Sequence, residues 1–257
     1  KDSFPGCYDI SSAGHLDPGE DFLKGAIREL REELGICASA EDLQPLGLHE
    51  IDRTHEFYGE TFHNREIVSV YMLELIPQDH EIHFQESEIS DVMWMEADTL
   101  LRMVKSNAFS HCLEVEEVEP IVEELQKRLR LQDQLRFLLE ADKEKEIIRQ
   151  TYKTSLKKEN DAEHSWHMAV MAYLLKEYAN EEIDIAKVML MCLIHDIVEI
   201  DAGDTYAYDA IGNQSKRERE VKAAERIFHI LPEDQAVYIR QLWEETSRIT
   251  SVSRFRK

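Results

Sequence analysis

The sequence predicts an α/β domain followed by an all-α domain. Residues 14–36 have the pattern of an amphipathic helix, and residues 47–57 and 65–76 are strand candidates, the second rich in β-branched and aromatic residues. From about residue 130 onward nearly every segment has helical periodicity. A chain of 257 residues with 43% hydrophobic residues has enough material for two modest cores.

The segment Gly14–Ile36, GHLDPGEDFLKGAIRELREELGI, carries the first chemical signal. At ~100° per residue, Glu29, Glu32 and Glu33 share one arc of a helix. A neighbouring arc is apolar and can seat the helix on a sheet; it holds Leu23, Ile27, Leu30 and Leu34. Three clustered carboxylates repel one another unless a cation offsets them, and Mg²⁺ or Mn²⁺ suits such an oxygen-rich site.

The ends of this helix follow from its capping residues. Asp17 is the expected N-cap, with Pro18 in the first turn and Glu20 at capping-box spacing. Gly35 is expected to end the helix.

The same spacing resembles the Nudix box, G-x5-E-x7-R-E-U-x-E-E-x-G-U with U apolar. Every specified position matches, namely Gly14, Glu20, Arg28, Glu29, Leu30, Glu32, Glu33, Gly35 and Ile36. The resemblance implies that the three glutamates hold Mg²⁺ or Mn²⁺ together with the Gly14 carbonyl. It also implies that Arg28 orients the glutamates by ion pairing and that Glu20 supports the box from outside the metal sphere. A Glu-rich surface helix is the alternative.

The rest of the first half agrees in order with the Nudix α/β/α sandwich. A turn and short strand are expected at residues 4–15, a hairpin loop at 58–64, a strand at 89–95 and a helix at 97–104. The family's leading strands should precede Phe4-Pro5-Gly6, so we expect an incomplete first domain. Glu88 is either an outlying base or ligand, or a solvated loop residue.

The segment FPGCYDISSAGH resembles the Nudix branch related to isopentenyl-diphosphate isomerases. No equivalent of the isomerase's catalytic cysteine motif is present, so the resemblance favours hydrolysis. It implies cleavage of a nucleoside diphosphate linked to a group X.

Residues 113–148 are almost free of Gly and Pro, which predicts one long helix or two helices broken near Pro120. We place the domain boundary near residue 130, giving domains 1–130 and 131–257.

In the second half, the candidate metal-binding and catalytic residues lie in residues 159–175 and 185–205. An apolar helix ends in His195-Asp196, with Glu199 one turn later. Buried polar groups need partners, and a metal ion held together with His164 would supply one. The alternative for His195 alone is a satisfied core histidine.

The motifs AEHSW, HDIVE and AGDT resemble the HD-domain phosphohydrolases, in particular the 5'-deoxynucleotidase branch. The resemblance implies that His164, His195 and Asp196 bind a divalent metal such as Mn²⁺, Co²⁺ or Zn²⁺. It implies that Glu199 handles the water or a proton, and that Asp204 helps to fix the substrate or leaving group.

Arg149 and Trp166 lie where that branch recognises the phosphate and the sugar. The alternatives are an exposed helical Arg149 paired with Glu146, and a Trp166 in the core. The family's late aspartate ligand has no counterpart, because the last aspartate, Asp234, lies in a loop-like segment. We therefore expect a truncated C-terminus or an altered metal sphere, and missing material at both ends indicates a fragment.

The net charge and the cysteine content limit which classes of partner and which compartment are expected. The formal net charge of -23 argues against a nucleic-acid polymer or an anionic membrane as the main partner. Nucleotides are not excluded, because a bound metal reverses the local sign. The four cysteines form no CxxC pair, which indicates reduced thiols and a cytoplasmic protein. The apolar run at 188–194 is too short to span a bilayer.

The leading functional prediction is a bifunctional metal-dependent hydrolase of small-molecule nucleotides. Its first half would cleave a nucleoside diphosphate-X linkage, and its second half would dephosphorylate a (deoxy)nucleoside monophosphate. The resemblance also implies a homodimer through the second domain. The alternatives are a nucleotide-binding regulator with one or both sites inactive, and a prenyl-diphosphate isomerase.

Overall fold

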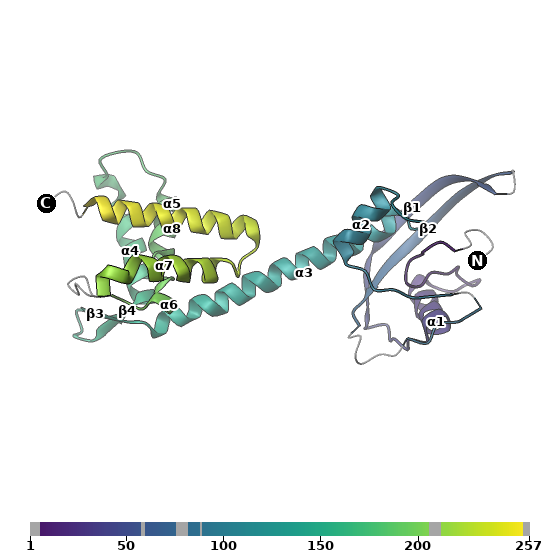
Figure 1. Ribbon diagram of the computed structural model, residues 1–257, viewed down its shortest axis with the longest axis horizontal. Coiled ribbons are helices and arrows are strands. Elements are labelled where there is room, and N and C mark those ends of the chain that lie inside the picture. The colour runs from purple at the N-terminus through teal and green to yellow at the C-terminus, as the bar shows by residue number, and fades with distance from the viewer. Residues whose placement is uncertain (1–5, 58–59, 76–81, 88, 206–211, 254–257) are drawn as a thin grey trace. The chain divides into compact units, whose positions relative to one another are not determined.

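The computed structural model describes residues 6–57, 60–75, 82–87, 89–205 and 212–253. The chain divides into two compact units, Lys1–Lys127 and Arg128–Lys257. The first mixes helices with a β-hairpin, and the second is mainly helical, which confirms the expected α/β plus all-α class (Figure 1). Among the described residues, no helix combines the length and apolar character that crossing a bilayer requires.

Helix α1 of the first unit spans Phe22–Leu34. The expected N-cap at Asp17 is wrong: Asp21 is the N-cap, and its side chain accepts from the Lys24 backbone N–H at 2.9 Å. The physical reason is Gly19, whose φ of +86° interrupts the chain between Pro18 and the helix. Gly35 ends the helix as expected, in the left-handed conformation with φ 69°.

Strands β1 (Leu43–Phe57) and β2 (Glu60–Leu73) form an antiparallel hairpin. Both expected strands are therefore confirmed with shifted bounds: β1 begins four residues before residue 47, and β2 begins at Glu60 and ends at Leu73, before residue 76. The expected loop at 58–64 is shorter than predicted, because Glu60 already pairs with Phe57. A register shift between Pro45 and Gly47 marks a bulge near the start of β1.

The expected strand at 89–95 is wrong, because its described residues form no strand. Helix α2 (Ala97–Lys105) is confirmed to within one residue. It packs into a core of buried apolar side chains: Val104, Leu113, Val118 and Val122. Tyr8 pairs with His111 in an isolated parallel bridge rather than in a strand.

Helix α3 spans Val115–Ala141 without a break, and Pro120 lies in its second turn. A short 3-10 helix, η1 (Asp142–Glu146), follows it. Of the two expected arrangements, the single long helix is the one observed.

The second unit contains a small hairpin that the sequence pattern did not predict. Strand β3 (Ile148–Tyr152) pairs antiparallel with β4 (Lys158–Asn160). The remaining elements are helical: α4 (Asp161–Leu174), η2 (Lys176–Tyr178), α5 (Ile185–Ile194), α6 (Glu199–Ala202), α7 (Gly212–Phe228) and α8 (Glu233–Ser253).

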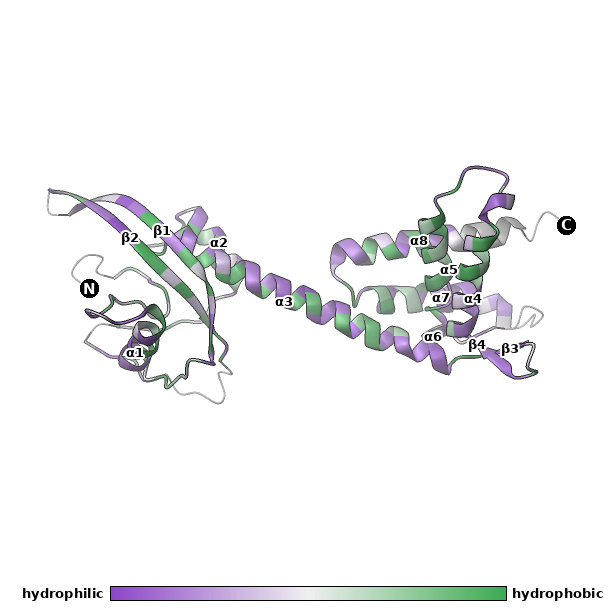
Figure 2. Ribbon diagram, turned by 180° about the vertical axis from the view of Figure 1, so that it is seen from behind, coloured by the Kyte–Doolittle hydropathy of each residue, from purple (hydrophilic) through white to green (hydrophobic). Residues whose placement is uncertain are grey.

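The core of the second unit lies between α5, α7 and α8. Figure 2 shows α5 as hydrophobic along most of its length, as its sequence IAKVMLMCLI requires. Phe228 and Trp243 meet edge-on with ring centroids 6.2 Å apart, and both are almost fully buried. Because α5 is packed in this core, residues 196–199 just after it are also buried, and the candidate site lies beside them.

Candidate functional site

The glycine that opens the Nudix-like segment lies directly against a glutamate of α1. A Cβ added to Gly14 would lie 1.9 Å from Glu29 Oε1, so any larger residue there requires the Glu29 side chain to move. The backbone at Gly14 therefore approaches a carboxylate that the sequence predicts to be a metal ligand.

Arg28 forms hydrogen bonds with three of the predicted glutamates of this segment. Its Nη1 donates to Glu29 Oε1 at 2.7 Å and to Glu32 Oε2 at 3.3 Å. Its Nε and Nη2 donate to the two oxygens of Glu20 at 3.2 and 3.0 Å, and Nη2 also donates to the His15 carbonyl at 3.0 Å. The hydrogen bond from Arg28 lowers the pKa of Glu20. Arg28 therefore pairs with two of the three glutamates that it is expected to orient, Glu29 and Glu32, and also with Glu20, for which no ion pair was predicted.

Glu33 is held differently. Its side chain is buried, and Oε2 accepts from the Ala13 backbone N–H at 3.1 Å. Its backbone carbonyl accepts from the Gln85 N–H at 2.9 Å, so residues 83–85 run along the end of α1. Glu88, the suggested outlying base, lies outside the described residues.

The three glutamates do not form a compact ligand set in this structure. Within the described part of the chain, groups of three metal-ligating side chains with atoms within 4.8 Å of one another occur only in the second unit. Glu29 and Glu32 instead turn toward Arg28, and Glu33 toward Ala13. An open groove of about 530 Å³ runs beside these residues, lined by Lys24, Ile27, Arg28, Arg31 and Glu32.

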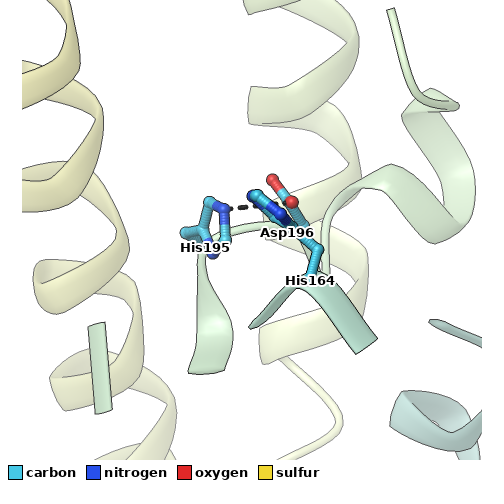
Figure 3. Close-up of side chains that lie close together, drawn as sticks. All are labelled: His164, His195 and Asp196. Atoms are coloured by element: carbon cyan, nitrogen blue, oxygen red, sulfur yellow. Dashed lines mark ion pairs between the residues drawn. The ribbon is translucent and has the colours of Figure 1, made fainter. Parts of the chain in front are cut away.

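The second unit brings together His164, His195 and Asp196, here called the histidine–aspartate cluster. Figure 3 shows their side chains close together, and one ligand atom from each lies within 4.8 Å of the others. The two imidazole centroids are 5.6 Å apart, and His195 Nε2 is 3.0 Å from Asp196 Oδ2. The convergence of His164 with His195-Asp196 is the arrangement that the sequence predicts.

Local structure fixes these positions. His164 lies in the first turn of α4, which begins with a complete capping box between Asn160 and Glu163. His195 caps the C-terminus of α5, and its φ of -66° and ψ of -33° carry the chain directly into Asp196. The Glu199 backbone N–H donates to the Asp196 carbonyl at 2.8 Å, which starts the turn into α6.

Hydrogen bonds leave both imidazoles suited to bind a metal through Nε2. His195 Nδ1 lies 2.7 Å from the Cys192 carbonyl, which can only accept, so Nδ1 carries the proton. His164 Nδ1 lies 3.4 Å from a Glu159 carboxylate oxygen. Partners of this kind at Nδ1 orient metal-binding histidines in general. Burial opposes a charge on His195, but the hydrogen bond and charge of Asp196 raise its pKa.

Arg149 enters the same site from β3. Its Nη1 donates to Asp196 Oδ2 at 2.6 Å and to Asp161 Oδ1 at 2.8 Å. The alternative of an exposed helical arginine paired with Glu146 does not match this placement, because Arg149 is on a strand and its side chain is only 18% exposed.

Asp161, Asp196 and Glu199 form a second group, here called the carboxylate cluster, and all three are buried. Burial raises the pKa of Glu199 to about 9 and that of Asp161 to about 6. Lys216 Nζ lies 3.4 Å from Glu199 Oε1. Glu199 Oε2 and Asp161 Oδ2 are buried, and neither has a donor among the described residues.

Asp161 is a site residue that the sequence interpretation missed. It lies three residues before His164, and this i, i+3 spacing puts both on one face of α4. That spacing was the available signal, but a helix-starting aspartate is also an ordinary feature of helix termini.

The remaining predicted residues lie outside both clusters. Trp166 is 64% exposed and stacks on His167 with centroids 6.3 Å apart, so it is not a core residue. Asp204 is half-buried, and its charge helps to raise the pKa of Glu199. Asp234, the last aspartate of the sequence, accepts from Arg130 at 2.7 Å and belongs to neither cluster.

The donor sets fit divalent metals. Two imidazoles and a carboxylate suit first-row transition ions, with open positions left for water or substrate. Beside Asp196, Glu199 Oε2 and Asp161 Oδ2 are buried polar atoms without a hydrogen-bond donor among the described residues, and a nearby cation would compensate them.

Comparison with known proteins also divides the chain into two parts, each matched by a different family model. The family model of the NUDIX domain matches residues 1–111, and that of the HD domain matches residues 141–257. The chain therefore joins a NUDIX domain to an HD domain, which confirms the fusion indicated by the two sets of motifs.

Individual relatives match one half each. A 5'-deoxynucleotidase of Homo sapiens is 32% identical over 94 residues, 37% of this chain and 45% of that protein. An uncharacterised Nudix hydrolase of Clostridium acetobutylicum is 33% identical over 104 residues, 40% of this chain and 48% of that protein. The chain thus spans about half the length of these curated relatives.

A crystal structure is also similar to part of the chain. It is that of a predicted metal-dependent phosphohydrolase from Magnetospirillum magnetotacticum MS-1. Its sequence is 55% identical, and the match covers 46% of this chain and 60% of the other with a TM-score of 0.43.

Proposed function

We propose that this protein is a metal-dependent nucleotide hydrolase with two sites. The NUDIX domain would cleave a nucleoside diphosphate-X linkage, and the HD domain would dephosphorylate a (deoxy)nucleoside monophosphate. The observation that carries the proposal is the convergence of His164, His195 and Asp196, with Arg149 bonded to the same aspartate.

In the HD domain, the histidine–aspartate cluster would hold Mn²⁺, Co²⁺ or Zn²⁺. Such an ion polarises a phosphoryl oxygen and lowers the pKa of bound water. Arg149 would bind a phosphate oxygen through its guanidinium, which is suited to oxyanions. Glu199 retains its proton at neutral pH because burial raises its pKa to about 9, so it can give that proton to the leaving oxygen.

Two further residues would contact the nucleoside. Trp166 presents an exposed ring beside His167, a surface on which a sugar or base can stack. Asp204 would help to fix the substrate or the leaving group near Glu199.

In the NUDIX domain, Glu29, Glu32 and Glu33 would hold Mg²⁺ or Mn²⁺ with the Gly14 carbonyl. Arg28 keeps two of these carboxylates on one side of α1 through hydrogen bonds at 2.7 and 3.3 Å. The close approach of Gly14 to Glu29 supports a backbone ligand at that position.

The two reactions form a logical sequence, since the monophosphate released by the first is the substrate class of the second. We include in the proposal a homodimer through the HD domain, supported by exposed apolar side chains on the part of α3 that leads into it, such as Leu135, Leu138 and Leu139. A reducing, cytoplasmic compartment is also part of it, since all four cysteines are free.

The test is a substrate panel of NTPs, dinucleotides and deoxynucleoside monophosphates with Mg²⁺, Mn²⁺ or Co²⁺. Glu33→Gln should abolish cleavage of diphosphate linkages and spare phosphate release from monophosphates. His195→Ala should have the opposite effect. If the wild-type protein releases phosphate or nucleotide products from no member of the panel, the proposal is wrong.

A second candidate, a nucleotide-binding regulator with an inactive NUDIX site, is favoured by one observation. The three glutamates are tied to Arg28 and Ala13 instead of converging. In that case Glu33→Gln would leave nucleotide binding and any phenotype unchanged, and the wild-type protein would not cleave any diphosphate linkage.

A further inference from the structure

Asp161 is a fully buried carboxylate to which the proposed reaction assigns no role. It is the first residue of α4, its exposed fraction is 0%, and its backbone N–H donates to the Ile147 carbonyl at 3.1 Å. A buried carboxylate is unfavourable unless it is paired with a cation or donors. Its position therefore depends on the side chain that compensates its charge.

That side chain is Arg149. A single guanidinium nitrogen, Nη1, donates to Asp161 Oδ1 at 2.8 Å and to Asp196 Oδ2 at 2.6 Å. Arg149 is thus held between a predicted metal ligand and a carboxylate outside that ligand set. Because Asp161 and His164 are one turn apart on α4, the same helix fixes both the arginine and a metal-binding histidine.

A direct role for Asp161 as a ligand of a second cation is less consistent with this geometry. The oxygens of Asp161, Asp196 and Glu199 do approach within 4.8 Å. However, Nη1 already lies between Asp161 and Asp196, so an ion that bridges the same oxygens has to displace the guanidinium.

We propose that Asp161 is a positioning residue that holds Arg149 beside Asp196, ready to bind the phosphate of a nucleoside monophosphate. This inference rests on the proposed function of the HD domain. Arginine has a long and flexible side chain, and a guanidinium already held in place loses less conformational freedom when the phosphate binds. Asp161 therefore acts on substrate affinity through Arg149 and touches neither the metal nor the substrate.

The test is Asp161→Asn in the full-length, metal-loaded protein. The amide is nearly isosteric but removes the charge that holds the guanidinium. We expect the KM for a deoxynucleoside monophosphate to rise about tenfold, the loss of one charge-assisted hydrogen bond. The kcat and the metal affinity should change less than about threefold, because Asp161 touches neither the reacting atoms nor the ion. Asp161→Ser, which is smaller, should raise KM similarly if the amide variant does not fold.

Glu140→Gln is the matched control. Glu140 is also a buried carboxylate of this unit, and it accepts from Arg226 at 2.5 Å and Lys143 at 2.7 Å. Among the described residues, the hydrogen-bond partners of its side chain are Arg226 and Lys143, and neither belongs to one of the two clusters. We expect this variant to keep the wild-type KM while losing thermal stability.

A double-mutant cycle with Arg149→Ala separates positioning from a general structural effect. In the Arg149→Ala background, Asp161→Asn should change KM less than about twofold, because the residue through which it acts is gone. A wild-type KM in Asp161→Asn, or the full tenfold rise in the Arg149→Ala background, would overturn the inference. Loss of a bound metal ion in Asp161→Asn would also overturn it, because Asp161 would then be a ligand.

The inference about Asp161 can still be tested if the proposed hydrolase activity is absent. If the wild-type protein hydrolyses no nucleoside monophosphate, the cycle is measured by calorimetric binding of a deoxynucleoside monophosphate and of inorganic phosphate. The inference then requires an affinity about tenfold weaker in Asp161→Asn and coupled to Arg149. Equal affinities in the two proteins would contradict it.

Discussion

Glu144 gives a sharp test of the electrostatics around the HD site. Its carboxyl is buried in η1, where Ser165 Oγ donates to Oε1 at 3.2 Å. Burial raises the pKa of Glu144 from its ordinary value of 4.5 to about 7, and the charges of Asp196 and Asp161 act in the same direction. Each pKa unit corresponds to ~1.4 kcal/mol, so ionised Glu144 destabilises the fold by about 3 kcal/mol.

The sign of the pH dependence follows directly. Well below pH 4.5 the group is protonated in both the folded and the unfolded chain, so it contributes no penalty. Between pH 4.5 and about 7 the unfolded chain loses the proton first, and stability falls. Glu144→Gln removes this titration. Relative to the wild-type protein, the variant should therefore gain about 3 kcal/mol between pH 4.5 and pH 8.

The assay is urea unfolding at the two pH values, followed by the fluorescence of the buried Trp243. The exposed Trp94 and Trp166 are replaced by Phe in both proteins, so that the signal reports on the core of the second unit. Glu140→Gln is a control of opposite sign, because Lys143 and Arg226 lower the pKa of Glu140. That variant should lose more stability at pH 8 than at pH 4.5. An equal free-energy difference between Glu144→Gln and wild type at both pH values would refute the reasoning.

Three further predictions concern packing and helix ends. Gly14→Ala places a Cβ 1.9 Å from Glu29 Oε1, and we expect about a 100-fold loss of diphosphate cleavage with unchanged release from monophosphates, both read by product chromatography. Asp21→Ala removes the α1 cap and should cost the first unit about 1 kcal/mol in denaturant unfolding, whereas Asp17→Ala should cost less. Ile227→Ala, at a position with 0% exposure, should destabilise the second unit by about 3 kcal/mol in the same experiment; a loss below about 1 kcal/mol would contradict its place in the core.

Local signals in the sequence predicted most of the elements that position the sites. Apolar periodicity located α1 and α2, and the apolar run before His195 located α5 and its end. The β-branched composition of residues 65–76 located β2. These features depend on neighbours along the chain, which a single sequence displays.

The errors arose where the residue pattern along the chain allows more than one structure. Residues 89–95 alternate like a strand, but alternation forms a strand only where another strand pairs with it, and Val92, Met93 and Trp94 are exposed here. The N-cap moved from Asp17 to Asp21 because the positive φ of Gly19 breaks the helix, a backbone choice that spacing alone does not fix.

The HD site shows the same contrast. The motif spacing predicted that His164 would meet His195 and Asp196, and the structure brings their ligand atoms within 4.8 Å. The link between Arg149 and Asp161 was not predictable, because it depends on the β3–β4 hairpin bringing the arginine back to the start of α4.

The most direct test of the account is metal binding coupled to phosphate release in the HD domain. The metal-free protein is titrated calorimetrically with Mn²⁺ or Co²⁺, and phosphate release from a deoxynucleoside monophosphate is measured on the same samples. We predict that His195→Ala weakens one site about 100-fold and abolishes phosphate release, while diphosphate cleavage persists. Full phosphate release by His195→Ala would contradict the assignment of His164, His195 and Asp196 as the metal centre.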